Sequence, residues 1–244
     1  RVRLSYLRKV VPRSISRASL VSTPSEYVRQ KLISEFAISP AKVKVVRHGI
    51  DEQLGKLATS EQELRQRLRL ENKQVLFLPA VTHPHKNHKF LLQLMKTHWV
   101  DKNLVLVCAG GKGRGEVDFM REVRRLNLDD RVIRLDRVAD HDRDGLLKLA
   151  KALVFPSLYE GFGAPVIEAM QLETPVISSD CAALPEIVGD AGIVLPLDLN
   201  LWASALDTLM ARRDSLIAAG RIRAAHFSVS NSGKDLAQIY RTAI

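Results

Sequence analysis

The stretch from Pro156 to Leu172, PSLYEGFGAPVIEAMQL, follows a short run of strand-forming residues, Ala152 to Phe155. It contains two glycines, and Pro165 stands where a helix would begin, since proline favours the first helical position. A strand, a glycine-containing loop and a helix N-terminus form a common anion site, because free backbone N–H groups and the helix dipole point at the ligand. Two carboxylates, Glu160 in the loop and Glu168 near the end of the first helical turn, flank this site. Phosphate alone does not account for them, whereas a ligand that also carries hydroxyl groups does.

Around this stretch, short apolar runs alternate with helical patterns. The runs that we predict to be strands are Val75 to Val81, Asn103 to Ala109, Arg131 to Asp136, Ala152 to Pro156, Pro175 to Ser179 and Gly192 to Leu195. Strands buried on both faces appear as continuous apolar runs, and alternation with helices implies parallel strands joined by right-handed crossovers. We therefore predict an α/β fold with a doubly wound, Rossmann-like parallel sheet of six strands, whose ligand lies at the carboxyl ends of the strands.

Other predicted elements flank this sheet. They are a strand over Ala18 to Ser22, a helix over Tyr27 to Phe36, a strand over Lys42 to Val46, a helix from the capping box at Ser60 to near Leu70, and helices over Leu201 to Ala219 and Lys234 to Ile244. The turn-like sequence Arg47-His48-Gly49-Ile50-Asp51 marks a domain boundary. We expect residues 1–50 to end one domain, residues 51–230 to form the sheet domain, and residues 231–244 to form a C-terminal helix.

The composition, 46% hydrophobic and 26% charged, is that of a soluble globular protein. No apolar run reaches the roughly 18 residues that a membrane-spanning helix needs, and we expect no signal peptide. Two cysteines, Cys108 and Cys181, are too few for a disulfide framework and suit a reducing compartment, so we expect a cytoplasmic location.

The net charge of +10 is compatible with nucleic acid, an anionic membrane surface or an anionic substrate as the partner. Much of it lies in the first 17 residues, which have no acid and contain Arg1, Arg3, Arg8, Lys9, Arg13 and Arg17. A solvated basic helix and a peripheral patch that faces an anionic membrane both explain this run. Aromatic residues make up only 5%, without the basic–aromatic interleaving of a base-stacking platform, so nucleic acid is discounted.

Four loops follow predicted strands and therefore share the ligand edge of the sheet. They are Thr82 to His88, Gly110 to Gly115, Asp136 to Val138, and the loop that contains Glu160. Cationic side chains at Lys86, Lys112 and Arg114 would bring positive charge to an anion held at the Pro165 helix. The loop GGKGRG fits neither a dinucleotide fingerprint nor a Walker loop, and a flexible surface turn is its alternative interpretation.

Two clusters have spacings found in metal sites. The histidines are His83, His85 and His88. Because the cation of Lys86 stands among them, we prefer loop or helix-entry roles to a metal site. The aspartates, with D-x-D spacing, are Asp140, Asp142 and Asp144. We expect a helix to start beside them at Gly145, where acids are favoured by capping and by the helix dipole. No metal is therefore expected.

Glu160 and Glu168 have two interpretations. One is a solvated loop acid and an exposed helix acid. The other is a binding role, because a carboxylate accepts two hydrogen bonds from the vicinal hydroxyls of a ribose, at about 1.5 to 3 kcal/mol each when desolvated. Their positions at the ligand edge favour the second interpretation, in which one carboxylate holds a nucleotide ribose and the loop holds phosphate and sugar.

These residues resemble a known family. Glu160 to Glu168 fits the E-x7-E pattern of retaining nucleotide-sugar glycosyltransferases, and EGFGAPVIEAM resembles glycosyltransferase family 4. The likeness continues through ETPVISSDCAALPEIVGDAGIVLP, HPHKN, GGKG, VVRHGID and HFSVS, and it is most specific over residues 152–196. It implies the C-terminal, donor-binding domain of a GT-B architecture. Only the end of the N-terminal, acceptor-side domain would be present, and the C-terminal helix would return toward it.

The resemblance also implies roles for single residues. Lys86 would bind the donor diphosphate, Glu168 the ribose hydroxyls, and Glu160 would lie beside the transferred sugar. The other expected donor-binding residues, several through backbone groups, are Gly111, Lys112, Val138, Gly161, Phe162, Gly163 and Ala164. Ala80 stands where many members carry an arginine, and His85 or Arg114 could replace it. The family uses no catalytic metal.

The resulting hypothesis is a retaining glycosyltransferase that moves a hexose from a nucleoside diphosphate sugar to a saccharide or lipid-linked acceptor in surface polysaccharide synthesis. Mannose from GDP-mannose is the leading donor. A non-catalytic nucleotide-sugar-binding or scaffolding module is the alternative, and an epimerase or phosphorylase of the same architecture is a third. No cofactor is expected. The N-terminal half would belong to a longer chain or come from another one.

Overall fold

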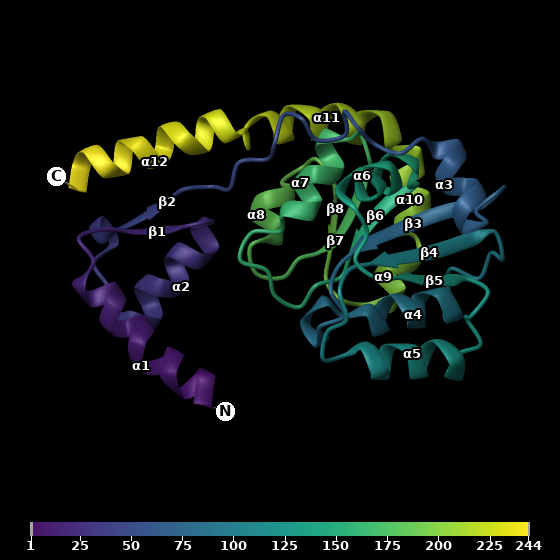
Figure 1. The fold of residues 1–244 in the computed structure, drawn as a ribbon, viewed down its shortest axis with the longest axis horizontal. Coiled ribbons are helices and arrows are strands. Elements are labelled where there is room, and N and C mark those ends of the chain that lie inside the picture. The colour runs from purple at the N-terminus through teal and green to yellow at the C-terminus, as the bar shows by residue number, and fades with distance from the viewer. Residues whose placement is uncertain (1, 244) are drawn as a thin grey trace.

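The computed structural model describes residues 2–243 and contains two parallel sheets (Figure 1). The larger sheet consists of β3 (Gln74–Pro79), β4 (Leu104–Ala109), β5 (Val132–Leu135), β6 (Ala152–Phe155), β7 (Val176–Ser179) and β8 (Ile193–Leu195). Its strand order is β5-β4-β3-β6-β7-β8, and every neighbouring pair is parallel. The predicted doubly wound parallel sheet of six strands is thus confirmed.

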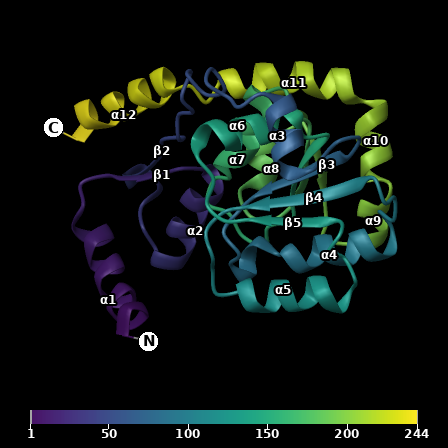
Figure 2. The same ribbon diagram turned by 45° about the vertical axis from the view of Figure 1, so that its right-hand side comes forward.

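Helices cover both faces of this sheet (Figures 1 and 2). They are α3 (Glu61–Leu68), α4 (His88–Thr97), α5 (Glu116–Arg125), α6 (Asp140–Leu149), α7 (Ala164–Gln171) and α8 (Leu184–Val188). In both views α4 and α5 lie on one side of the sheet, and α3, α6 and α7 on the other. The strands between them are apolar because neither face meets water, and β4 and β6 are buried along their whole length.

The predicted helix over Leu201 to Ala219 is wrong as a single element. Three helices take its place, α9 (Leu199–Ala203), α10 (Ala205–Ala211) and α11 (Arg213–Ala225). The buried Trp202 indole donates to the carbonyl of Pro196, which ties α9 to the end of the sheet. Gly220 brings α11 against α7, where an added Cβ would lie 3.3 Å from Met170. These long-range contacts determine where the helices bend, and helical periodicity does not reveal them.

The remaining elements lie to one side of the larger sheet (Figure 1). They are α1 (Val2–Arg17), β1 (Val21–Thr23), α2 (Glu26–Phe36), the 3-10 turn η1 (Pro40–Lys42), β2 (Val43–Val45) and α12 (Val229–Ala243). Strands β1 and β2 form the smaller sheet. Helix α12 starts before the predicted Lys234, and Arg1 and Ile244 lie outside the described residues. No helix within residues 2–243 has the length and apolar character needed to cross a membrane.

Candidate functional site

The strand order reverses between the neighbouring strands β3 and β6: from β3 the chain continues toward β5 on one side, and from β6 toward β8 on the other. The crevice of the larger sheet opens at this point. The loop after β3 contains a 3-10 turn, η2 (Pro84–Lys86), and the loop after β6 contains Glu160. Lys86 Nζ lies 2.5 Å from Glu160 Oε1, with only 17% and 13% of the two side chains exposed. The Lys86 ammonium also lies 5.1 Å from the centre of the Phe155 ring. The two residues expected to act on the diphosphate and the sugar therefore form an ion pair with each other.

The histidines of the first loop have separate surroundings. His83 and His85 stack with ring centres 5.8 Å apart, whereas His88 is buried in edge-to-face contact with Phe119. Burial and the charge of Lys86 lower the pKa of His85. Among residues 2–243, no group of three His, Cys, Asp or Glu side chains is arranged to hold a metal ion.

The N-terminus of α7 faces the same crevice. The helix begins at Ala164, one residue before the predicted Pro165, and follows Gly163 with φ +98°. A residue with a side chain would be strained at this φ, and an added Cβ would lie 2.9 Å from Leu184. No side chain caps the helix. Pro165 has no N–H, and the Val166 amide donates to the Gly163 carbonyl at 3.0 Å, so the Ala164 amide is the N–H of the first turn that remains for an anion.

A cavity of about 580 Å³ lies at the carboxyl ends of β3 and β4 and reaches α6 and α7. Four of the expected donor-binding residues line it, Gly111, Val138, Ala164 and Glu168. Gly161, Gly163, Lys86 and Glu160 lie outside its lining. The Phe162 ring is buried against His48 and Phe227, so only its backbone is available to a ligand.

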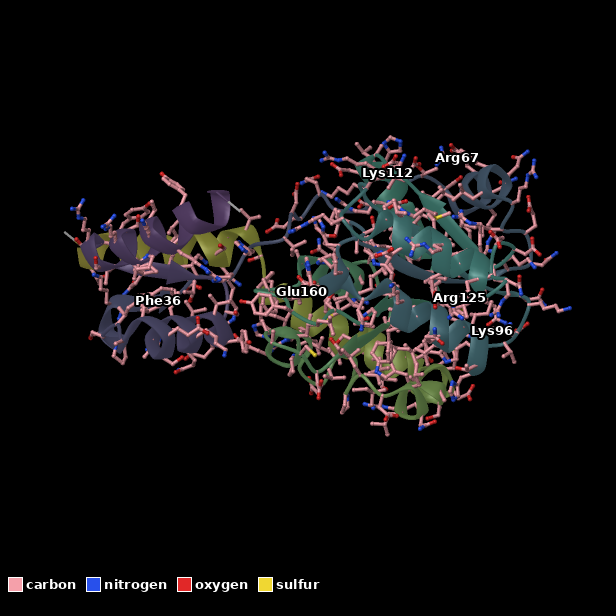
Figure 3. The ribbon with its side chains drawn as sticks, turned by 90° about the horizontal axis from the view of Figure 1, so that it is seen from below. Phe36, Arg67, Lys96, Lys112, Arg125 and Glu160 are labelled. Carbon is pink, nitrogen blue, oxygen red and sulfur yellow. The ribbon has the colours of Figure 1, made fainter. Side chains whose placement is uncertain are left out.

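Lys112, expected to bind the donor, is also absent from the lining of this cavity. It is 69% exposed and lies 3.5 Å from Asp136. Figure 3 shows Glu160 on the side of the molecule that faces the N-terminal elements, with Lys112 farther away.

Glu168 is largely buried in the cavity wall. The pKa of its carboxyl is raised, chiefly by burial; Arg143 opposes the rise, and Asp144 and Asp140 add to it. Arg143 Nε lies 4.0 Å from Glu168 Oε2 and is part of the same cavity lining. Arg143 was not among the predicted site residues, because the predicted start of this helix, Gly145, lies two residues beyond the arginine. Acids are favoured in the first turn of a helix, so Asp140 and Asp142 were the signal for an earlier start.

The expected helix start at Gly145 is wrong, and so is the capping role of the aspartates. Helix α6 begins at Asp140, and no side chain caps it. Asp142 accepts from Thr59 and pairs with Arg67, each at 2.6 Å. Burial alone would raise the pKa of Asp142, but these two partners lower it. Asp142 and Asp144 bind residues that precede the larger sheet, Thr59 and Arg67 through side chains and Gly55 through its amide, whereas Asp140 pairs with Arg143 of its own helix.

The glycine loop after β4 is held by buried polar groups. Arg134 pairs with Glu116 at 2.9 Å and donates to the carbonyl of Gly110. Thr82 donates to Glu116 at 2.5 Å and accepts from the Gly113 amide at 2.8 Å, which joins this loop to the one that carries Lys86. These contacts exclude the flexible-turn interpretation.

The N-terminal elements contact the crevice through α2. The Glu186 carboxylate accepts from the amides of Glu26 and Tyr27 at 3.0 and 3.1 Å, and it pairs with Arg47 at 3.2 Å. Ser25, the N-cap of α2, donates to the carbonyl of Gly161 at 2.7 Å. The glycine loop of α7 is thus in direct contact with the N-terminal part of the chain.

Comparison with known proteins gives a consistent result. The family model for glycosyl transferases group 1 matches residues 60–220. O-antigen chain mannosyltransferase B of Escherichia coli is 28% identical over 98% of this chain and 65% of its own length. O-antigen chain mannosyltransferase RfbU of Salmonella typhimurium is 30% identical over 86% of this chain and 56% of its own. The chain thus spans less than two thirds of either relative.

Solved structures share the fold. The crystal structure of Anabaena HepE in complex with UDP and glucose superimposes with a TM-score of 0.85, over 98% of this chain and 67% of that one. The sequence identity is 23%, so this likeness concerns the fold.

Proposed function

The chain belongs to the glycosyl transferases group 1 family, and we propose that it binds a nucleoside diphosphate sugar and takes part in transferring the hexose to an acceptor. The observation that carries the proposal is the arrangement at the sheet's crevice. Lys86, the N-terminus of α7 and the largely buried carboxylate of Glu168 lie at the same edge of the sheet, where a doubly wound fold binds its ligand.

Each group suits one part of such a donor. Glu168 accepts hydrogen bonds from the ribose hydroxyls, and the backbone amides from Gly161 to Ala164 bind the diphosphate. Lys86 exchanges its contact with Glu160 for the diphosphate and stabilises the negative charge that develops on this leaving group. Glu160 then lies beside the transferred sugar. The E-x7-E resemblance supports transfer with retention of anomeric configuration.

The two O-antigen mannosyltransferases support mannose as the transferred sugar, and we propose GDP-mannose as the donor. The HepE structure contains UDP, so a uridine donor is the direct competitor. We propose a saccharide or lipid-linked saccharide as the acceptor, in the synthesis of a surface polysaccharide. Exposed basic side chains of α1, at Arg8, Lys9, Arg13 and Arg17, would support a peripheral location on an anionic cytoplasmic membrane face.

Calorimetric titration with GDP and UDP tests the donor site. We expect one of the two to bind, and we expect Glu168→Ala to weaken that binding by about tenfold or more, because up to two charge-assisted hydrogen bonds are lost. No binding of either nucleotide would refute the proposal. Transfer from radiolabelled GDP-mannose to a saccharide acceptor tests the reaction, and binding without transfer would favour the non-catalytic module. Proton NMR of the product's anomeric centre reports retention or inversion.

A further inference from the structure

The Glu168 carboxylate has a charged neighbour but no hydrogen-bond donor among residues 2–243. Arg143 Nε lies 4.0 Å from Glu168 Oε2, beyond hydrogen-bonding distance, and the Glu168 side chain is only 19% exposed. A carboxylate so poorly hydrated needs a cation nearby to remain ionised. Arg143 is in the right place to supply that charge.

Other groups hold Arg143 at this distance. Its Nε and Nη2 donate to Asp144 Oδ1 at 3.2 and 2.9 Å, and its Nη1 donates to Asp140 Oδ1 at 3.0 Å. Asp144 is itself fixed, because its other oxygen accepts from the Gly55 amide at 2.8 Å and its side chain is 10% exposed. A continuous set of contacts therefore runs from Gly55 through Asp144 and Arg143 to the cavity.

The length of the Arg143–Glu168 contact has a chemical consequence. A bidentate arginine would occupy the lone pairs of a carboxylate, and a ligand could not use them. At 4.0 Å the guanidinium charge still acts through the low-dielectric surroundings, while both oxygens remain free to accept. Asp140 and Asp144 draw the guanidinium away from the closer pairing.

We propose that Arg143 is a positioning residue for Glu168: held by Asp144 and Asp140, it keeps the carboxylate charged and leaves both of its oxygens to the vicinal hydroxyls of a bound ribose. The identity of that ligand rests on the proposed function. The electrostatic coupling of the two side chains does not.

The other charged groups near Glu168 leave Arg143 as the principal cation. Asp140 and Asp144, on α6, oppose ionisation of Glu168. Arg137 lines the same cavity from the β5 loop. On α11, which packs against α7, Arg221 pairs with Glu173 at 3.6 Å, and Arg223 donates to the carbonyl of Ile187. Removing the charge of Arg143 should therefore raise the pKa of the Glu168 carboxyl further.

The first experiment measures the side-chain carboxyl of Glu168 by carbon-13 NMR as a function of pH, using the whole 244-residue chain. Glu168→Gln identifies the signal. Arg143→Gln keeps a donor for Asp144 but removes the charge, so we expect the titration of Glu168 to move to higher pH. Arg143→Lys should restore most of the wild-type behaviour. An unchanged titration in Arg143→Gln overturns the proposal, whatever the protein binds.

The second experiment measures the affinity for GDP and UDP at pH 6 and pH 8. We expect Arg143→Gln to lose several-fold more affinity at pH 6 than at pH 8, because a protonated Glu168 accepts fewer hydrogen bonds. Asp144→Asn should weaken binding at both pH values, since it releases Arg143 to pair with Glu168. The matched control is Arg67→Gln, which removes a partner of Asp142 on the same helix but away from the cavity.

The outcomes separate the two proposals. If the wild type binds neither nucleotide, the proposed function fails, and the NMR titration alone decides the coupling. If Arg143→Gln shifts the Glu168 titration and yet binds nucleotide normally at both pH values, the ligand does not use the carboxylate and the positioning role is overturned. If Arg143→Gln and Arg143→Lys both lose the same amount of nucleotide affinity at pH 6 and at pH 8, the role of Arg143 is purely structural, and the positioning role is overturned.

Discussion

Lys86 Nζ lies 2.5 Å from Glu160 Oε1, and this ion pair joins the loops of two adjacent strands across 74 residues of sequence. Neither side chain is more than 17% exposed, so each depends on the other for its charge to be compensated. A diphosphate entering the crevice would offer Lys86 a stronger anionic partner. The ion pair is therefore well placed to exchange when the donor binds.

Replacing Lys86 by Met should weaken GDP or UDP binding by about tenfold or more, because a partly buried cation near the diphosphate is lost. Binding of the corresponding nucleoside, which has no phosphate, should change much less. Isothermal titration with both ligands measures the difference. Lys96→Met, an exposed lysine at the end of α4, is the control. An equal loss for nucleotide and nucleoside would show that Lys86 does not act on phosphate.

Glu160→Gln should have the opposite effect on the nucleotide. The substitution removes a negative charge 2.5 Å from Lys86, so the lysine becomes available to the diphosphate and we expect affinity to rise several-fold. Sugar transfer should fall sharply, since Glu160 is proposed to contact the transferred sugar. Calorimetry and a transfer assay on the same preparation test both statements. Weaker nucleotide binding would mean that the Lys86–Glu160 pair supports the site rather than competing for it.

The sheet was predictable because strands buried on both faces are apolar throughout, as β4 and β6 are. The alternation of strands and helices predicted that Lys86 and Glu160 lie at the same edge of the sheet. Their direct contact depends on side-chain geometry, which a sequence pattern does not encode. Arg143 could not be singled out from the sequence for a different reason. Its role depends on where α6 begins, and that start has no capping side chain to reveal it.

Burial lowers the pKa of His88 from 6.5 to about 4, so the neutral ring is favoured in the folded protein. The unfolded chain takes up a proton as the pH falls through 6.5, and the folded chain does so only near pH 4. The stabilisation contributed by neutral His88 is therefore fully present above pH 6.5 and is lost as the pH falls from 6.5 toward 4. The free energy of unfolding, measured in urea, should fall by about 2 kcal/mol between pH 7 and pH 5 because of this residue. His88→Leu should lose less over that range, and an equal loss would assign the effect to other groups.

The two cysteines should differ in reactivity. Burial raises the pKa of the Cys108 thiol to about 12, and its side chain is enclosed in β4. Cys181 is partly exposed after β7. Iodoacetamide at pH 8 should therefore modify one thiol in the native protein and two in denaturant, as counted by mass spectrometry. Cys181→Ser should leave the native protein unmodified, and labelling of Cys108 in that variant would show that β4 opens readily.

The contact between Glu186 and α2 should determine how firmly the N-terminal elements attach to the crevice. Its carboxylate accepts hydrogen bonds from the amides of Glu26 and Tyr27, which lie at the positive end of the helix dipole and have no partner within the helix. Glu186→Ala leaves both amides without this partner, at a cost of about 1 to 2 kcal/mol, and should speed hydrogen exchange in α2 by about tenfold. Glu35→Ala, which removes an exposed partner of Lys31 on the same helix, is the matched control.

Because Ser25 at the start of α2 donates to Gly161, the faster exchange should be accompanied by weaker nucleotide binding in Glu186→Ala but not in the control. Equal exchange in the two variants would show that other contacts hold α2 in place.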